Sequence, residues 1–97
     1  MPLSGKQRHY LRGLGHALEP VVHVGKDGVT DAVAAALSEA LVTHELVKVK
    51  LGPNTPDDRH EAADDLAARS SSELVQVLGK VVLLYRPRPE EPQIVLP

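Results

Sequence analysis

The spacing of apolar residues changes from a helical to an alternating period within one short stretch, and this change most restricts the possible folds. Residues 29–44 carry apolar side chains at the i, i+4, i+7 and i+8 spacing of a helix, with Thr30 as the expected N-cap. Residues 45–51 alternate instead and place Lys48 and Lys50 on one face. The pattern predicts a helix that leads directly into a strand.

The N-terminal part of the chain predicts a second helix and a second strand. Ser4 is followed three residues later by Gln7, which is the signature of a capping box. Glycines weaken the far end of this helix, so we expect it to end near Gly15 or His16. The β-branched run at residues 21–24 follows a proline and is typical of a strand.

A third helix is expected after the break at residues 52–54. Thr55 is the expected N-cap, Pro56 suits the first turn, and Asp58 would be the capping-box acid. The apolar stripe of this segment is thin and consists mainly of alanines. We expect the helix to end around Arg69.

The C-terminal part predicts a hairpin and a proline-rich tail. Residues 74–78 and 81–86 are joined by Gly79 and Lys80, and a two-residue loop with glycine first suits a type II′ turn. The tail at residues 87–97 contains four prolines and cannot continue a ladder far. Its apolar residues 94–96 are expected to dock as a short edge strand.

These elements predict an α/β fold with the order α-β-α-β-α-β-β. Its length of 97 residues suits a single domain over residues 1–97. Right-handed crossovers would place the second and third helices on the same face of a mixed four-stranded sheet, giving a two-layer sandwich. The other face is too apolar to be left wholly in water, so the first helix, the tail or a partner should cover part of it. The side chains expected on that face are Leu46, Lys48, Lys50, Leu74, Gln76, Leu78, Val82, Leu84 and Arg86.

Composition excludes several functions. The chain has no Cys, which removes disulfides, thiolate metal sites and Cys nucleophiles. Its N-terminus lacks the apolar stretch of a signal peptide, and no apolar run approaches the about 18 residues of a membrane span, so we expect a cytoplasmic protein without membrane contact. With aromatic residues at 2% of the chain, base stacking can contribute little to any nucleic-acid contact.

Catalysis and metal binding are not favoured. The five histidines show no metal-ligand spacing, so we expect no metal and no cofactor. His23 near Asp27 and Asp31 could be drawn as an acid–base group, but no nucleophile motif accompanies it. A small hydrolase using His23 is therefore the least favoured function, and we expect neither catalytic residues nor a small-molecule substrate.

The glycine-flanked sequence Gly25-Lys26-Asp27-Gly28 lies between a predicted strand and a predicted helix. Glycines let a backbone turn with positive φ and let a phosphate approach closely, and a helix N-terminus offers free N–H groups. By itself the spacing fits either a plain βα turn or a loop that contacts phosphates. It is neither a Walker A motif nor a dinucleotide fingerprint.

The charges are segregated along the chain, although the net charge is −2. Residues 53–73 contain six acids and two arginines, whereas the stretch 74–89 contains no acid. The polar side of the first helix is basic. One surface should therefore be electropositive while the third helix is acidic. The basic residues expected to contact RNA on the electropositive surface are Lys6, Arg8, Arg12, Lys48 and Lys50, and the acid-free stretch adds Lys80, Arg86 and Arg88 to the basic residues of the chain.

Seven blocks of this sequence, in order and at matching separations, resemble a stand-alone bacterial CRM domain of the YhbY type. The blocks are residues 3–8, 11–14, 20–22, 25–30, 44–50, 75–80 and 84–87. The resemblance covers essentially the whole chain. It implies a fold like that of the C-terminal domain of bacterial translation initiation factor three, RNA binding, and association with precursors of the large ribosomal subunit.

The resemblance also implies a role for the glycine loop. Gly25, Lys26 and Gly28 would contact the RNA backbone, as does the G-x-x-G loop of KH domains. Asp27 departs from a purely basic loop and would weaken a phosphate site unless its carboxylate caps the following helix.

We therefore predict a non-enzymatic protein that binds ribosomal RNA in precursors of the large subunit. Its contacts would be made to the RNA backbone by the loop and the basic surface. The alternative is a protein-interaction module that uses the apolar open face around Leu46, Leu78 and Leu84 without touching RNA.

Overall fold

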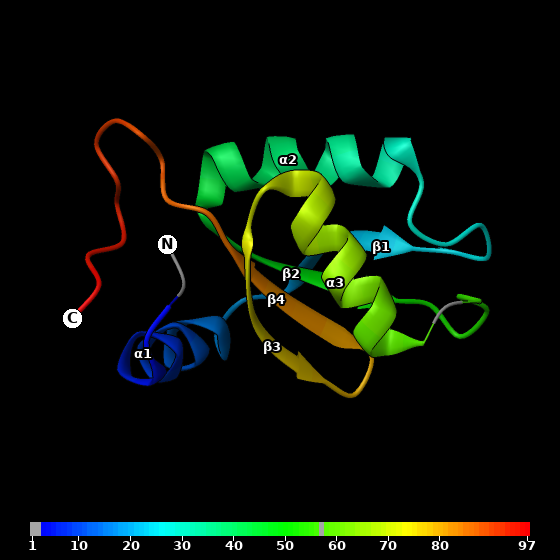
Figure 1. The fold of residues 1–97 in the computed structure, drawn as a ribbon, viewed down its shortest axis with the longest axis horizontal. Helices are drawn as coiled ribbons and strands as arrows, with labels where there is room; N and C mark the ends of the chain where they lie inside the picture. The colour runs from blue at the N-terminus through cyan, green and yellow to red at the C-terminus, as the bar shows by residue number, and fades with distance from the viewer. Residues whose placement is uncertain (1–2, 57) are drawn as a thin grey trace.

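A computed structural model describes residues 3–56 and 58–97, and its elements follow the predicted order (Figure 1). The helices are α1 (Gly5–Gly15), α2 (Asp31–His44) and α3 (Arg59–Ser70), and the strands are β1 (Pro20–Val24), β2 (Leu46–Leu51), β3 (Glu73–Leu78) and β4 (Val81–Tyr85). The predicted α-β-α-β-α-β-β order is confirmed.

The four strands form one mixed sheet in the order β1-β2-β4-β3. β1 pairs with β2 in parallel, and β4 pairs antiparallel with both β2 and β3. Helices α2 and α3 cover one face, while α1 lies on the other face (Figure 1). The predicted α/β sandwich is confirmed. The core between the sheet and α2 and α3 includes Val24, Leu37, Leu41, Val47, Val49, Leu66, Val82 and Leu84.

Local capping signals fix the starts of the first two helices. The Ser4 hydroxyl accepts from the backbone N–H of Gln7, and the Gln7 side chain accepts from the backbone N–H of Ser4, so the capping box is present. The Thr30 hydroxyl accepts from the Val33 N–H at 3.2 Å and caps α2 as expected. Both predicted N-caps are confirmed.

The predicted N-cap of the third helix is wrong. Helix α3 begins at Arg59, and the carboxylate of Asp58 accepts from the backbone N–H groups of His60 and Glu61. Thr55 has another task, because its hydroxyl donates to the carbonyl of Val24 at 3.0 Å. A tertiary contact between loop and strand thus overrides the local capping pattern.

The expected open face is right for β2 but wrong for both residues expected from β4. Directly paired residues share a face of a sheet, and Leu78 pairs with Val81 across the two-residue turn. Val82 therefore points to the face opposite Leu78, and both Val82 and Leu84 are buried under α2 and α3. Gly79 has φ 59°, as the first central position of a type II′ turn requires.

An irregularity in β3 removes Leu74 from the expected open face. The register shifts between Leu74 and Gln76, which is the mark of a bulge. Leu74 packs on the α2 and α3 side, while Val75 joins the cluster under α1. Gln76 and Leu78 keep the predicted side.

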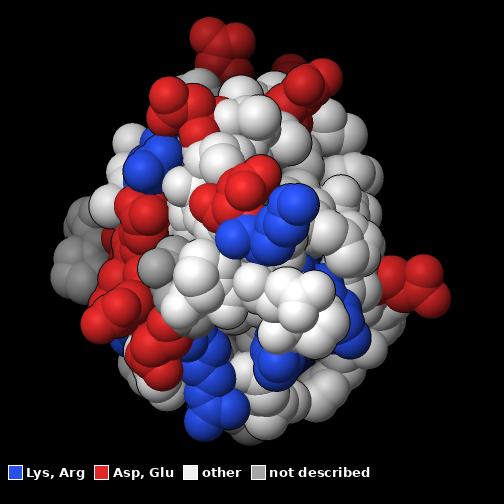
Figure 2. All heavy atoms as spheres, turned by 90° about the vertical axis from the view of Figure 1, so that its right-hand side faces the viewer, with Lys and Arg blue, Asp and Glu red and all other residues white. Residues whose placement is uncertain are grey.

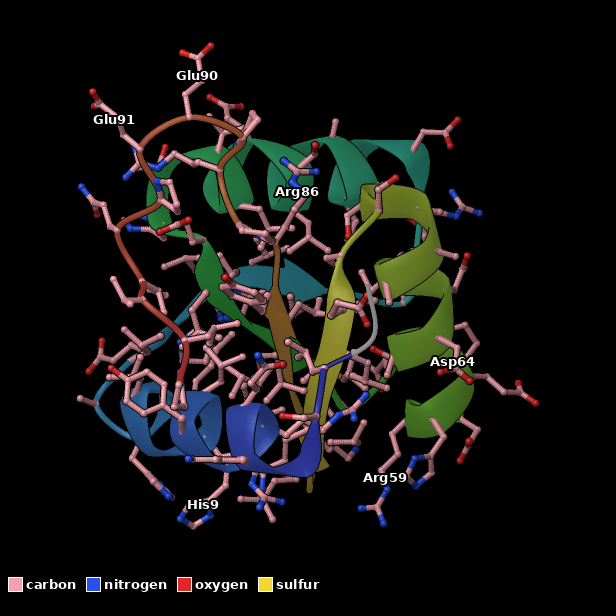
Figure 3. The ribbon with its side chains drawn as sticks, turned by 60° about the vertical axis from the view of Figure 1, so that its left-hand side comes forward. His9, Arg59, Asp64, Arg86, Glu90 and Glu91 are labelled. Atoms are coloured by element: carbon pink, nitrogen blue, oxygen red, sulfur yellow. The ribbon has the colours of Figure 1, made fainter. Side chains whose placement is uncertain are left out.

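Arg86 also lies on the side opposite to that expected. Its guanidinium donates to the carbonyl of Ser70 at 2.6 Å and to the carbonyl of Ser38 at 2.9 Å. Figure 3 shows the side chain pointing between α2 and α3. Arg86 thus joins the two helices rather than serving an exposed surface.

The apolar part of the α1 face is covered by α1 and by the tail, as predicted. Ile94 and Leu96 pack against the cluster of Leu3, Leu11, Leu46, Val75, Leu83 and Tyr85. Residues 94–96 do not form the expected edge strand. Their backbone is held instead by the buried Glu45 carboxylate, which accepts from the Ile94 N–H at 3.0 Å.

Within residues 3–56 and 58–97, no helix combines the length and the apolar character needed to cross a bilayer.

Candidate nucleic-acid interface

The loop between β1 and α2 forms a tight turn with its charged residues at the tip. The Gly28 N–H donates to the Gly25 carbonyl at 3.1 Å, and Gly28 has φ 72°, a conformation that favours glycine. Lys26 and Asp27 are both exposed. Because Thr30 caps α2, the Asp27 carboxylate does not, and it makes no hydrogen bond or ion pair within the described residues.

Three turns meet at this end of the sheet. The Gly52 N–H donates to the Val24 carbonyl at 2.8 Å, which fixes the segment after β2 beside the glycine loop. The Leu51 N–H donates to the Lys80 carbonyl at 2.7 Å, which brings in the turn between β3 and β4. The Arg59 guanidinium donates to the Gly79 carbonyl at 3.4 Å.

The convergence of these turns adds two basic residues that were not among the residues predicted to contact RNA. Lys80 and Arg59 lie at the same end of the sheet as Lys26, and both are exposed. Lys80 lies in the stretch 74–89 that contains no acid, and this feature of the sequence could have identified it as a candidate RNA contact. Arg59 was hidden because its sequence neighbours are acidic.

The charges at this end are separated in space as they are in sequence. Figure 2 shows Lys and Arg atoms in the centre and along the lower part of this end, whereas most Asp and Glu atoms lie on the side of α3 and at the top, with others beside the central basic atoms and at the right edge. Arg69, on the acidic side, pairs with Asp31 at 3.0 Å and with Asp65 at 2.9 Å. Asp64 points outward from the same helix (Figure 3). An approaching polyanion therefore meets one favourable and one unfavourable side.

The predicted basic residues of β2 lie on the sheet face that carries α1. Lys48 pairs with Leu83, and Leu83 pairs with Gln76, so these three side chains form a row across β2, β4 and β3. The next row toward the turns consists of Lys50, Val81 and Leu78. His23 pairs with Lys50 from β1 and is exposed.

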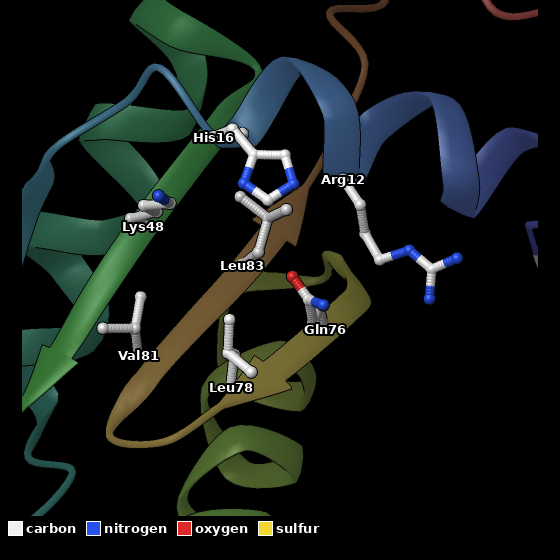
Figure 4. A pocket seen from close by; sticks show the side chains of 8 residues that line it. Arg12, His16, Lys48, Gln76, Leu78, Val81 and Leu83 are labelled. Atoms are coloured by element: carbon white, nitrogen blue, oxygen red, sulfur yellow. The ribbon is translucent and has the colours of Figure 1, made fainter.

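Helix α1 closes one side of these rows to form a cleft. Residues from the second half of α1 line it together with side chains of β2, β3 and β4 (Figure 4). The lining residues are Arg12, Gly15, His16, Lys48, Gln76, Leu78, Val81 and Leu83. The structure thus brings Arg12 and Lys48, two of the predicted site residues, to the same cleft.

Lys6 and Arg8 are not brought to the glycine loop. They belong to the start of α1, which lies at the end of the molecule opposite the loop between β1 and α2 (Figure 1). The Arg8 guanidinium donates to the Leu3 carbonyl at 2.8 Å and so helps to hold the N-terminal segment. Lys6 is exposed.

No group of three or more His, Asp or Glu in the part of the chain that the structure describes could hold a metal ion. His9, for example, points away from the molecule on the outer side of α1 (Figure 3).

The topology, the glycine loop and the basic sheet face together define a class of small α/β domains with a G-x-x-G loop between a strand and a helix. The chain belongs to the CRS1/YhbY (CRM) domain family, whose model matches residues 3–86. The predicted family is therefore confirmed.

Individual relatives resemble the chain over nearly its whole length. It is 44% identical to Probable RNA-binding protein PA4753 of Pseudomonas aeruginosa, over 93% of this chain and 86% of the relative. It is 41% identical to Probable RNA-binding protein YqeI of Bacillus subtilis, over 98% and 99%. The solution structure of the hypothetical protein SAV1595 from Staphylococcus aureus matches with a TM-score of 0.84 and 39% identity, over 98% and 99% of the two chains.

Proposed function

We propose that this protein binds RNA and that residues 1–97 act as one RNA-binding unit of the CRM type. The observation that carries the proposal is the exposed Lys26 on the turn Gly25–Gly28, at an end of the sheet where Lys80 and Arg59 also lie. The names of the relatives from Pseudomonas aeruginosa and Bacillus subtilis, which describe RNA-binding proteins, support it.

The glycine loop would contact the phosphate backbone directly. A side-chain atom added at Gly25 would meet nothing within 4 Å, so the backbone there is open to an approaching group. Lys26 at the tip would supply the charge. Asp27 would repel a phosphate on its own side of the loop, which would orient the RNA toward Lys26.

The basic sheet face would continue the contact away from the loop. Lys50 lies on β2 close to the turns, and Lys48 and Arg12 follow toward α1. Lys6 and Arg8 would contribute where an RNA extends along α1, and less than the other sites because Arg8 already bonds Leu3. The net charge of −2 keeps nonspecific affinity low.

The cellular role would be in the assembly of the large ribosomal subunit, with ribosomal RNA as the partner. This part of the proposal is supported by the family, and it assigns no reaction to the protein. The test is co-sedimentation with ribosomal particles from a cell extract, followed by crosslink mapping. We expect the protein to travel with large-subunit precursors and to be released by ribonuclease.

Retention of the protein on the particle after ribonuclease treatment would favour the other candidate, a protein-interaction module. That candidate relied on Leu46, Leu78 and Leu84 as an open apolar face. The structure buries Leu46 under α1 and Leu84 under α2 and α3, leaving Leu78 exposed at 63%. The loss of this face favours RNA binding.

A further inference from the structure

We propose that the cleft beside the C-terminal half of α1 holds one unpaired nucleotide of the bound RNA, with its base against Leu78 and Val81 and its edge facing Gln76. This inference rests on the proposed function and deepens it. The sequence predicted contacts to the RNA backbone alone, whereas the cleft provides a place for a base.

The floor of the cleft is apolar and fixed by the sheet. Leu83 lies at its bottom, between Lys48 and Gln76 in one cross-strand row, and is only 3% exposed because α1 already covers it. Leu78, which is exposed, and Val81, which is half-buried, extend this floor toward the turns and form the accessible apolar part of it. A base placed here leaves water on one face without requiring an aromatic residue.

Helix α1 approaches this floor closely at Gly15. A Cβ atom added to Gly15 would lie 2.7 Å from Leu83 Cδ2, so a larger residue would displace the floor. The next residue, His16, holds its ring over Leu83 (Figure 4). The cleft is therefore bounded by the helix on one side and is open on the other.

The rim carries groups that match the two polar parts of a nucleotide. Gln76 offers both a donor and an acceptor, which is what recognition of a base edge needs. Arg12 and Lys48 stand on either side of the floor (Figure 4) and can pair with phosphates. None of the described residues that line the cleft is acidic.

The position of the cleft connects it to the glycine loop. Lys50 lies two residues beyond Lys48 on the same face of β2, about 6.6 Å along the strand. Beyond Lys50 come the turns that carry Lys80 and Lys26. An RNA strand whose nucleotide occupies the cleft would thus run over a continuous line of lysines. The lysines suit any polyanion, whereas the donor and acceptor of Gln76 beside an apolar floor suit a base rather than an acidic peptide.

The test compares two short RNA hairpins that differ by a single unpaired nucleotide in the stem. We expect the bulged hairpin to bind the full chain about five- to tenfold more tightly than the fully paired one. Gln76→Leu should bring the ratio of the two affinities to about one, because the base edge loses its hydrogen-bond donor and acceptor. Gln93→Ala, at an exposed glutamine of the tail, is the matched control and should keep the preference.

Thermal unfolding of each variant verifies that the fold is intact. Equal affinity of the wild-type chain for both hairpins, or an unchanged preference in Gln76→Leu, overturns the inference. In either case a loss of binding in Lys26→Glu would leave the proposed function standing, whereas binding of neither hairpin would remove both. Displacement of the bulged hairpin by a poly-glutamate peptide at similar concentration would also overturn it, in favour of an acidic peptide.

Discussion

The carboxylate of Glu45 accepts a hydrogen bond of 2.7 Å from the backbone N–H of Gln93, a residue 48 positions further along the chain. The same carboxylate accepts from the N–H groups of Arg88 at 2.8 Å and Ile94 at 3.0 Å. Glu45 is fully buried at the end of α2, with φ 62°. One buried charge therefore fixes the proline-rich tail over the sheet.

Glu45→Gln should lower the free energy of unfolding by about 2–4 kcal/mol. The amide replaces one acceptor oxygen by a donor, which then faces a backbone N–H that has no other acceptor. Urea unfolding measures the effect. Glu39→Gln, at an exposed position of the same helix, is the control and should change stability by less than about 0.5 kcal/mol. Equal effects in the two variants would contradict the role given to Glu45.

The same carboxylate should make stability depend on acid pH. Burial by itself raises the pKa of the Glu45 carboxyl, but the N–H groups of Arg88, Ile94 and Gln93 and the charge of Arg88 hold the pKa below its ordinary value of 4.5. A depressed pKa in the folded state gives stability that is present above the unfolded pKa and lost as pH falls through the folded pKa.

Unfolding measured between pH 7 and pH 2 tests this dependence. We expect the wild-type chain to lose stability below about pH 4.5, and Glu45→Gln to lose less over the same range. Parallel curves for the two chains would show that other carboxylates govern the acid transition.

The two loop glycines should respond differently to alanine. Gly28 has φ 72°, so Gly28→Ala should destabilise the fold by about 1–2 kcal/mol. Gly25→Ala meets nothing within 4 Å and should leave stability unchanged. If a phosphate approaches this backbone, Gly25→Ala should still weaken RNA binding, as measured by fluorescence anisotropy. Unchanged affinity in Gly25→Ala would argue against close approach.

Charge reversal at two exposed lysines compares how much the two ends of the molecule contribute to RNA binding. Lys26→Glu should weaken RNA binding about tenfold, because it removes a phosphate contact and places a second acid beside Asp27. Lys6→Glu makes the same change in net charge at the opposite end and should weaken binding less than about threefold. Titration of one structured RNA with both variants measures the difference, and equal losses would discredit the loop assignment.

Local signals in the sequence were sufficient for most of the fold. The capping box at Ser4 and the N-cap at Thr30 depend on residues three positions apart, and they fixed the starts of α1 and α2. The switch from helical to alternating spacing located the strands. The turn at Gly79 was equally local.

Features that depend on contacts between distant residues could not be predicted from the sequence. Thr55 looked like an N-cap but bonds Val24, 31 residues earlier. Glu45 was assigned to a strand because nothing in its neighbourhood shows that residues of the tail surround its carboxylate. The facing of Val82 depended on pairing across the hairpin, which simple alternation did not take into account.

The candidate site follows the same rule: its contiguous part was predicted from the sequence, and the parts that depend on distant contacts were not. The glycine loop is contiguous, so its residues could be named in advance. The approach of Lys80 and Arg59 to that loop depends on the pairing of three separate turns. The cleft forms because α1 lies beside the row of Lys48, Leu83 and Gln76. That row depends on how three strands pair, and the sequence of α1 carries no information about this pairing.

The central claim is that the glycine loop and the basic sheet face bind the RNA backbone through charge. The most direct test of this claim is the salt dependence of binding. Affinity for one structured ribosomal RNA fragment is measured at several salt concentrations for the wild-type chain and for Lys26→Ala. We predict that log K falls linearly with log salt, and that Lys26→Ala reduces the slope by about one. A flat line for the wild-type chain, or the same slope for both proteins, would contradict the account.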